Sequence, residues 1–123
     1  RARIAGYENW YAPKAKVYHV GSATTGTRYN EKKVFLAARN TIFVIYKNMP
    51  LLQFVLNLPF ILAGICIKTV FFLKKGFVKE YLKGILEGIK TCRTCPKVPF
   101  SVKNLKNYLK IQVELWCNLF RIL

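Results

Sequence analysis

The sequence predicts a mainly α-helical protein, with a short β-containing segment at its start followed by about four helices that associate with a membrane. Three observations lead to this prediction. Apolar residues recur at helical spacing in several segments after residue 30, residues 51–73 are almost entirely apolar, and the chain is strongly basic.

The composition favours a protein that lies on or in an anionic membrane. Hydrophobic residues make up 53% of the 123 residues, and 21 Lys and Arg against 5 acidic residues give a net charge of +16. A soluble domain of this length usually carries fewer apolar residues. High apolarity combined with strong positive charge suits an anionic lipid surface. The five acids are all Glu and are spread along the chain, so we do not expect an autonomous metal-dependent active site, which needs clustered carboxylates.

Residues 1–20 are predicted to form the end of a helix, a break at Gly6 and a short strand around Lys16–Val20. This strand contains His19, the only histidine in the chain. Taken alone, a histidine at the end of a strand is more often a structural or surface residue than a metal ligand. Residues 21–29 form a loop of small residues that matches neither a P-loop nor a dinucleotide-binding fingerprint. It is either a surface loop or a loop that closes over a bound phosphate.

The first complete helix is predicted to run from Glu31 to Lys47. Asn30 is placed to cap its start, and Pro50 ends it. Arg39 and Asn40 are polar residues in the middle of this otherwise apolar helix. Two interpretations are open: the pair belongs to a polar stripe that faces water, or it contacts phosphate, because a guanidinium group matches phosphate oxygens.

Leu51–Leu73 is the apolar centre of the chain, with Lys68 as its single charge. A helix of this length covers about 35 Å, which is enough to span a bilayer. Gln53 and Asn57 are polar, Pro59 removes a backbone donor, and Lys68 could extend its ammonium group toward the membrane surface. A re-entrant or monotopic helical hairpin bent at Pro59 therefore fits the sequence as well as a transmembrane helix does.

Two amphipathic helices follow the apolar segment. The first is predicted over Phe77–Lys90, with Lys and Glu on one face and on the other face Phe77, Val78, Tyr81, Leu82, Ile85, Leu86 and Ile89. Ser101 is placed to cap the second, which carries lysines opposite an apolar side.

Nucleic acid is the other common partner of so basic a chain. Here the basic residues alternate with wide apolar faces, Lys outnumbers Arg, and the sequence has no recognition-helix motif, RNP-like strand or zinc finger. We therefore expect an anionic membrane and no nucleic acid. The residues predicted to contact the membrane surface are Lys74, Lys75, Lys79 and Lys83, and each contributes about 1 kcal/mol near anionic lipid.

Cys92-Arg93-Thr94-Cys95 has the spacing of half a zinc site or of a redox motif. No second cysteine pair follows it, no histidine is near, and Pro96 and Pro99 place a turn after it. Two incidental thiols in a reducing cytoplasm are favoured over a pair of metal ligands.

The start of the chain also carries a family pattern: Arg1-Ala2, then Ala5-Gly6-Tyr7, then Tyr11-Ala12-Pro13-Lys14-Ala15-Lys16-Val17-Tyr18-His19. This pattern resembles the end of the catalytic domain of inverting family-two glycosyltransferases with a GT-A fold, in particular the bacterial rhamnosyltransferase-like branch that builds cell-envelope polysaccharides. Ser22 and Arg39-Asn40 match the serine-containing loop and the helix that follow in this family. The specific part of the resemblance covers the first third to two-fifths of the chain. The remainder matches only in being hydrophobic and basic.

The resemblance implies that residues 1–29 are the C-terminal end of a GT-A catalytic domain whose main body lies upstream, and that residues 30–123 are a basic, apolar membrane-associating region. It also implies that His19 completes a divalent-metal site, for Mg or Mn, near the diphosphate of a nucleotide-sugar donor. Arg39 and Asn40 would lie on the acceptor or diphosphate side. The catalytic and metal-binding Asp residues of the family would precede Arg1, so no catalytic residue and no bound metal are expected in this chain alone.

The expected function is that of the C-terminal part of a glycosyltransferase. The parent enzyme would transfer a sugar from a nucleotide-sugar donor to a polyprenyl-phosphate-linked acceptor or a nascent cell-envelope glycan. It would act at the cytoplasmic face of the cell membrane, as a peripheral, monotopic or single-span protein, and the fragment itself would be inactive. The alternative is a small non-enzymatic, basic helical protein that anchors to the membrane or mediates interactions.

Overall fold

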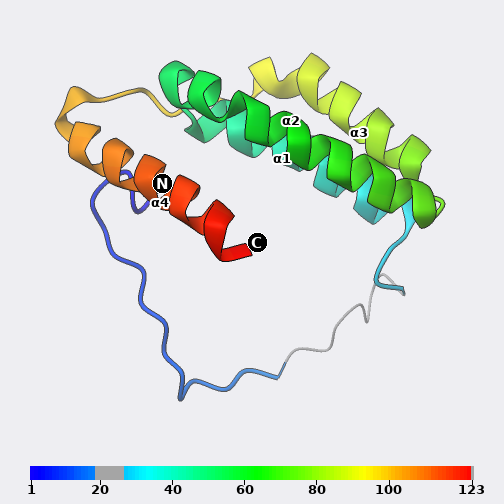
Figure 1. The fold of residues 1–123 in the computed structure, drawn as a ribbon, viewed down its shortest axis with the longest axis horizontal. Helices are drawn as coiled ribbons and strands as arrows, with labels where there is room; N and C mark the ends of the chain where they lie inside the picture. The colour runs from blue at the N-terminus through cyan, green and yellow to red at the C-terminus, as the bar shows by residue number, and fades with distance from the viewer. Residues whose placement is uncertain (19–26, 123) are drawn as a thin grey trace. The chain divides into compact units, whose positions relative to one another are not determined.

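The computed structural model describes residues 1–18 and 27–122. This part of the chain contains four α-helices (Figure 1): α1 (Glu31–Asn48), α2 (Leu51–Lys74), α3 (Val78–Thr91) and α4 (Leu105–Ile122). Two 3-10 turns, η1 (Cys92–Thr94) and η2 (Val102–Asn104), lie between α3 and α4. The predicted class, mainly α-helical with about four helices, is confirmed.

The chain divides into two compact units. The central unit is Val20–Val98, and the terminal unit is Arg1–His19 together with Pro99–Leu123. These two packing units do not coincide with the predicted regions 1–29 and 30–123. The predicted regions follow from a family resemblance, and packing within the chain does not test that resemblance.

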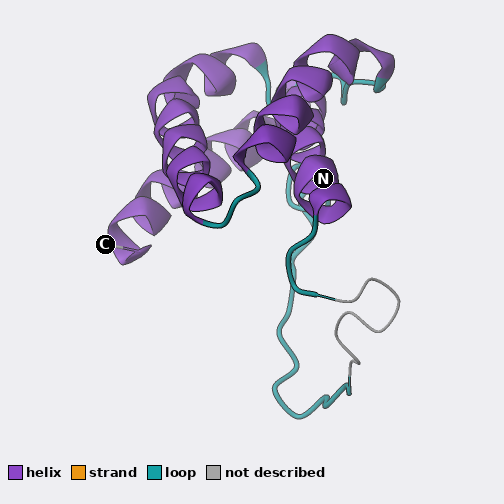
Figure 2. Ribbon diagram, turned by 90° about the vertical axis from the view of Figure 1, so that its right-hand side faces the viewer, coloured by secondary structure: helices purple, strands orange, loops and turns teal. Residues whose placement is uncertain are grey.

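No strand forms within the described residues, so the predicted β-containing segment is wrong for this part of the chain (Figure 2). Lys16–Tyr18 have no regular secondary structure, and the rest of the predicted strand lies outside the described residues. A strand needs a neighbouring strand to accept and donate its backbone hydrogen bonds. The described residues offer no such neighbour, and they show no remnant of a GT-A domain.

Residues 1–7 have the local geometry of a helix end. Gly6 has a φ of 91°. Its N–H donates to the carbonyl of Arg3 at 3.2 Å, and the N–H of Tyr7 donates to the carbonyl of Ala2 at 2.9 Å. These two bonds form a Schellman motif, in which a glycine takes the left-handed conformation that other residues avoid.

α1 begins at the predicted cap. The Asn30 side chain accepts a hydrogen bond from the backbone N–H of Lys33 at 2.8 Å, which satisfies one of the unpaired donors at the helix start. The helix ends two residues before Pro50, as the sequence predicted.

α2 is one continuous helix of 24 residues that passes through Pro59. The hairpin bent at Pro59, one of the two predicted alternatives, is therefore not formed. α2 ends in a second Schellman motif, where Gly76 has a φ of 79° and the N–H of Phe77 donates to the carbonyl of Phe72 at 2.9 Å. Phe72 and Phe77 both pack against the core, so the chain turns directly from α2 into α3.

The core of the central unit is the contact between α1 and α3, and its buried residues are Val34, Ala38, Tyr81 and Ile85. Gly84 and Gly88 allow the two backbones to approach closely. A Cβ atom at Gly84 would overlap the carbonyl oxygen of Phe35, and one at Gly88 would lie 2.8 Å from Cβ of Ile42. The contacts advance in the same direction along both helices, so α1 and α3 run parallel to each other.

The predicted apolar face of α3 is only partly buried. Tyr81, Gly84, Ile85 and Gly88 face α1 and are buried. Leu82, Leu86 and Ile89, which the sequence placed on the same apolar face, are 42%, 56% and 58% exposed. The hydrophobic pattern did not reveal this division, because glycine adds nothing to an apolar pattern even though it permits the closest packing.

In the terminal unit, η2 leads into α4. Ser101 precedes η2, but its side chain makes no capping hydrogen bond, so the predicted cap is not formed. The amide of Asn107 donates to the carbonyl of Ile4 at 3.0 Å, and Arg3 forms an ion pair with Glu114. These two contacts join the start of the chain to α4.

We expect Gly84→Ala to destabilise the central unit by about 1–3 kcal/mol, because the added methyl group overlaps a backbone carbonyl that cannot move independently of α1. Thermal unfolding of the full chain in detergent micelles, followed by circular dichroism, measures this effect. Gly64→Ala is the matched control. No atom lies within 4 Å of a Cβ at this position, and alanine favours a helix over glycine by up to about 1 kcal/mol. Equal melting temperatures for the two variants would contradict the packing described.

Candidate membrane-association site

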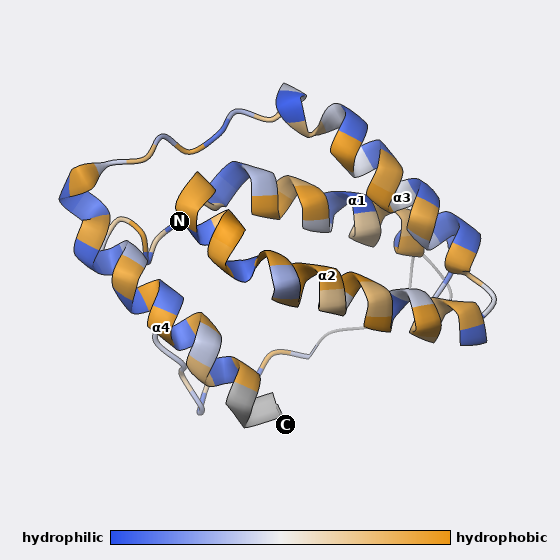
Figure 3. Ribbon diagram, turned by 45° about the horizontal axis from the view of Figure 1, so that its top comes forward, coloured by the Kyte–Doolittle hydropathy of each residue, from blue (hydrophilic) through white to orange (hydrophobic). Residues whose placement is uncertain are grey.

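α2 is the helix, among the described residues, that is long and apolar enough to cross a membrane. Only 6% of its most apolar 18-residue stretch is buried within the structure. Figure 3 shows that hydrophobic segments predominate along α2, with a few hydrophilic segments between them. Its exposed apolar residues include Leu51, Leu52, Val55, Leu56, Phe60, Leu62, Ile67, Val70, Phe71 and Leu73. The core helix of a soluble domain would bury such a surface, whereas α2 leaves it open within its unit.

Four exposed lysines surround the turn from α2 to α3. Lys74 is the last residue of α2, Lys75 caps it, and Lys79 and Lys83 lie in the first two turns of α3. The structure thus places the four residues predicted for the membrane surface at one end of the apolar helix. When an apolar helix lies in a bilayer, ammonium groups at its end reach the level of the lipid phosphates.

α3 carries a second surface on which exposed apolar residues lie beside exposed lysines. Leu82, Leu86 and Ile89 form an exposed apolar stripe, since they recur every three to four residues along the helix. The next stripe around the helix carries Lys79, Lys83 and Lys90, which are all exposed. Adjacent apolar and lysine stripes allow a helix to enter the membrane interface while the ammonium groups remain in water.

A cavity of about 220 Å³ lies between α1, α2 and α3. Its lining is mainly apolar and aromatic, and it consists of Tyr29, Val34, Ala37, Ala38, Thr41, Lys68, Phe71, Phe72 and Tyr81. Lys68 makes no ion pair or hydrogen bond with other described residues. Burial raises the pKa of the Tyr81 hydroxyl above its ordinary value of 10.0, and the Cys66 thiol contributes in the same direction. The Tyr81 hydroxyl therefore stays protonated at neutral pH and can donate a hydrogen bond. The sequence indicated Lys68 as a lone charge but gave no sign of a cavity beside it.

Arg39 and Asn40, the predicted phosphate or acceptor contacts, lie next to each other on the surface of α1. The Arg39 guanidinium donates to Oδ1 of Asn40 at 3.4 Å from Nε and at 3.3 Å from Nη2. It also lies over the ring of Phe43, 5.3 Å from its centroid. The pair does not line the cavity between the three helices, and its role stays a prediction.

His19, the predicted metal ligand, lies outside the described residues, as do Ser22 and most of the loop over residues 21–29. Among the residues that are described, no three His, Cys, Asp or Glu side chains come close enough together to hold a metal ion. Cys92 and Cys95 are both free thiols. The Mg or Mn site of the parent enzyme stays a prediction.

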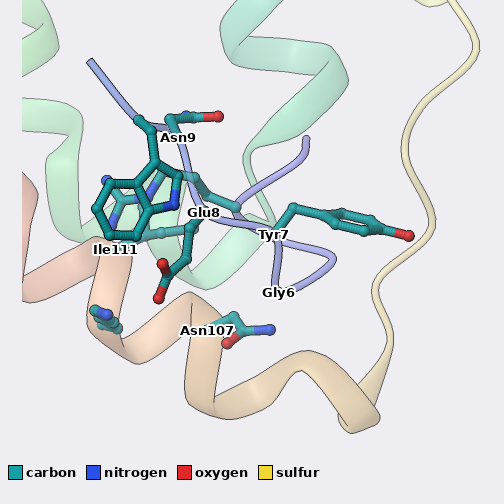
Figure 4. Close-up of a pocket in the computed structure, with 9 residues that line it drawn as sticks. Gly6, Tyr7, Glu8, Asn9, Asn107 and Ile111 are labelled. Carbon is teal, nitrogen blue, oxygen red and sulfur yellow. The ribbon is translucent and has the colours of Figure 1, made fainter. Parts of the chain in front are cut away.

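The terminal unit has a separate cavity of about 390 Å³ between the start of the chain and α4 (Figure 4). It is lined by Arg3, Gly6, Tyr7, Glu8, Asn9, Trp10, Asn107, Lys110 and Ile111. Figure 4 shows the Glu8 carboxylate directed toward α4 and the Tyr7 ring directed away from it. Sequence reasoning missed this cavity, because its two walls are about a hundred residues apart in the chain.

Comparisons with known proteins give no match for this chain among family models, curated proteins or solved structures. The glycosyltransferase resemblance therefore depends only on the residues quoted for it above.

We expect the combined replacement of Lys74, Lys75, Lys79 and Lys83 by Gln to remove the preference of the chain for anionic over zwitterionic vesicles. At about 1 kcal/mol for each lysine, the affinity for anionic vesicles should fall at least tenfold. Vesicle flotation at low and high salt measures this affinity.

The matched control replaces by Gln four bases that belong neither to the α2–α3 turn nor to the lysine stripe of α3: Lys14, Lys47, Arg93 and Lys97. This variant removes the same charge and should keep the preference for anionic vesicles. If both variants lose the preference equally, net charge alone determines binding, and the site at the α2–α3 turn is refuted.

Proposed function

We propose that this chain is a membrane-docking region that holds a family-two glycosyltransferase at an anionic membrane surface, as the C-terminal part of that enzyme. One observation carries the membrane part of the proposal: a 24-residue helix exposes apolar side chains along its length and ends among exposed lysines. The glycosyltransferase part is supported by the family pattern in residues 1–19 and by Arg39-Asn40.

In this proposal α2 lies in the hydrocarbon layer. A helix of this length covers about 36 Å, compared with about 30 Å for the hydrocarbon core of a bilayer. Contact with lipid removes the exposed apolar face of α2 from water, at a gain of about 25 cal/mol per Å² of apolar surface. The lysines at the α2–α3 turn then bind lipid headgroups. This fixes the chain in one orientation relative to the surface.

Docking of this kind suits an enzyme that acts on a lipid-linked acceptor. The nucleotide-sugar donor is soluble and reaches the catalytic domain from water. A polyprenyl-phosphate-linked acceptor stays in the membrane, so the enzyme must be held at the surface to meet it. The proposed location is the cytoplasmic face of the cell membrane.

A second candidate is a non-enzymatic membrane anchor or interaction module. It is favoured by the organisation of the central unit, which has its own core between α1 and α3 and its own apolar helix. Neither depends on the residues at the start of the chain that carry the family pattern.

The membrane part is tested by placing one charge at two depths of α2. Leu62 is 53% exposed near the middle of the helix, and Leu52 is 71% exposed near its start. We expect Leu62→Arg to cost about 2.5–3.5 kcal/mol of insertion free energy, whereas Leu52→Arg places its guanidinium near the interface at little cost. The measurement is the fraction of full-length chain that remains with vesicles after a urea wash. Equal retention of the two variants would mean that α2 does not enter the bilayer.

The glycosyltransferase part is tested by the reading frame upstream of Arg1. An in-frame extension that carries an Asp-x-Asp-like motif, and an Asp shortly before Arg1, supports the transferase. A start codon immediately before Arg1 contradicts it and leaves the membrane anchor as the function.

A further inference from the structure

Lys68 is the charged side chain in the interior of α2, six residues before Lys74 ends the helix. It lines the cavity between α1, α2 and α3 and has no ion-pair or hydrogen-bond partner among the described residues. An ammonium group within an apolar membrane helix is costly, and in membrane proteins such a group usually faces a partner or a ligand. Lys68 is exposed, so its ammonium group is open to a negatively charged partner from the medium that covers α2.

Tyr81 provides a second polar group in the same cavity. The residue is 3% exposed, and its ring stacks on Phe72 with the ring centroids 5.1 Å apart. Its hydroxyl forms no hydrogen bond within the described part of the chain. The hydroxyl is not sealed off from solvent, and the residue lines the open space of the cavity. It can therefore donate a hydrogen bond to an acceptor that binds there.

The remaining walls of the cavity determine what kind of anion fits. They are aliphatic and aromatic, apart from the Tyr29 and Thr41 hydroxyls, and the Thr41 hydroxyl already donates to the carbonyl of Ala37 at 2.9 Å. A small free anion would leave these apolar walls uncovered. An anion attached to hydrocarbon chains satisfies both Lys68 and the walls, and its chains can continue along the exposed apolar face of α2.

The depth of Lys68 agrees with a lipid phosphate. Six residues of helix correspond to about 9 Å along the axis of α2. A lysine stem spans much of that distance toward the helix end, so the ammonium group lies near the boundary between hydrocarbon and headgroups. The phosphate group of a phospholipid lies at this boundary, and lysine binds phosphate as a point charge.

We propose that the cavity between α1, α2 and α3 binds one anionic phospholipid, whose phosphate is held by the Lys68 ammonium group and the Tyr81 hydroxyl and whose acyl chains lie against α2. This inference rests on the proposed membrane association. It adds a discrete site for a single lipid to the broad surface formed by the lysines at the α2–α3 turn.

The test is native mass spectrometry of the full chain in detergent, titrated with phosphatidylglycerol or with diacylglycerol of the same acyl chains. We expect one phosphatidylglycerol to remain bound and diacylglycerol to bind at least about tenfold more weakly, since it lacks the phosphate. Lys68→Met and Tyr81→Phe should each weaken phosphatidylglycerol binding, by about tenfold for Lys68→Met, while Lys68→Arg should retain it. Lys97→Met, which removes an exposed charge that does not line the cavity, should bind within about twofold of the unmodified chain.

Three results would overturn the site: equal binding of the two lipids, equal weakening by Lys68→Met and Lys97→Met, or displacement of the lipid by an excess of inorganic phosphate, which would identify a free anion as the ligand. Unchanged helical circular dichroism of Lys68→Met and Tyr81→Phe shows that a loss of binding is local. Failure of this site appears as full lipid retention by Lys68→Met in a chain that still floats with vesicles. Failure of the membrane proposal appears as loss of flotation by the unmodified chain.

Discussion

The close contact between α1 and α3 is the constraint on which the central unit depends. Gly84 and Gly88 bring the backbone of α3 against α1, so a few small and medium side chains fill the interface. A core of this size cannot also cover a 24-residue apolar helix. The apolar surface of α2 and the outer stripe of α3 are left exposed as a direct consequence.

In the proposed function, lipid covers these exposed surfaces. The lysines at the α2–α3 turn are at one end of the apolar helix, where lipid headgroups would lie. Lys68 and Tyr81 place polar groups along an open cavity whose other walls are mainly apolar. Non-specific attraction and a specific lipid contact can therefore occur at the same end of α2, because the turn at Gly76 returns α3 alongside α1.

At the start of the chain, local hydrogen bonds determine the structure that forms. The helix end at Gly6 forms from local hydrogen bonds alone, and its geometry agrees with the sequence pattern. The extended segment after it has no strand beside it, so it remains irregular through Tyr18. The contacts with α4 come from the helix end before it, through the Asn107–Ile4 hydrogen bond and the Arg3–Glu114 ion pair. Strand formation depends on neighbours that a single segment cannot provide.

The sequence by itself determined where the helices form and that they are apolar and basic, because these properties depend on local signals. Asn30 caps a helix through its own side chain, and Pro50 prevents its continuation. The bounds of α2 follow from a long, mainly apolar run, but the sequence left open whether this run bends at Pro59. Only the tertiary structure decided which side of α3 is buried and where Lys68 lies relative to Tyr81. The first depends on how closely the backbones of α1 and α3 approach at Gly84 and Gly88, and the second depends on the turn at Gly76 that joins α2 to α3. The distance between the backbones of α1 and α3 is set by packing between segments far apart in the chain, and it leaves no periodic trace in the sequence.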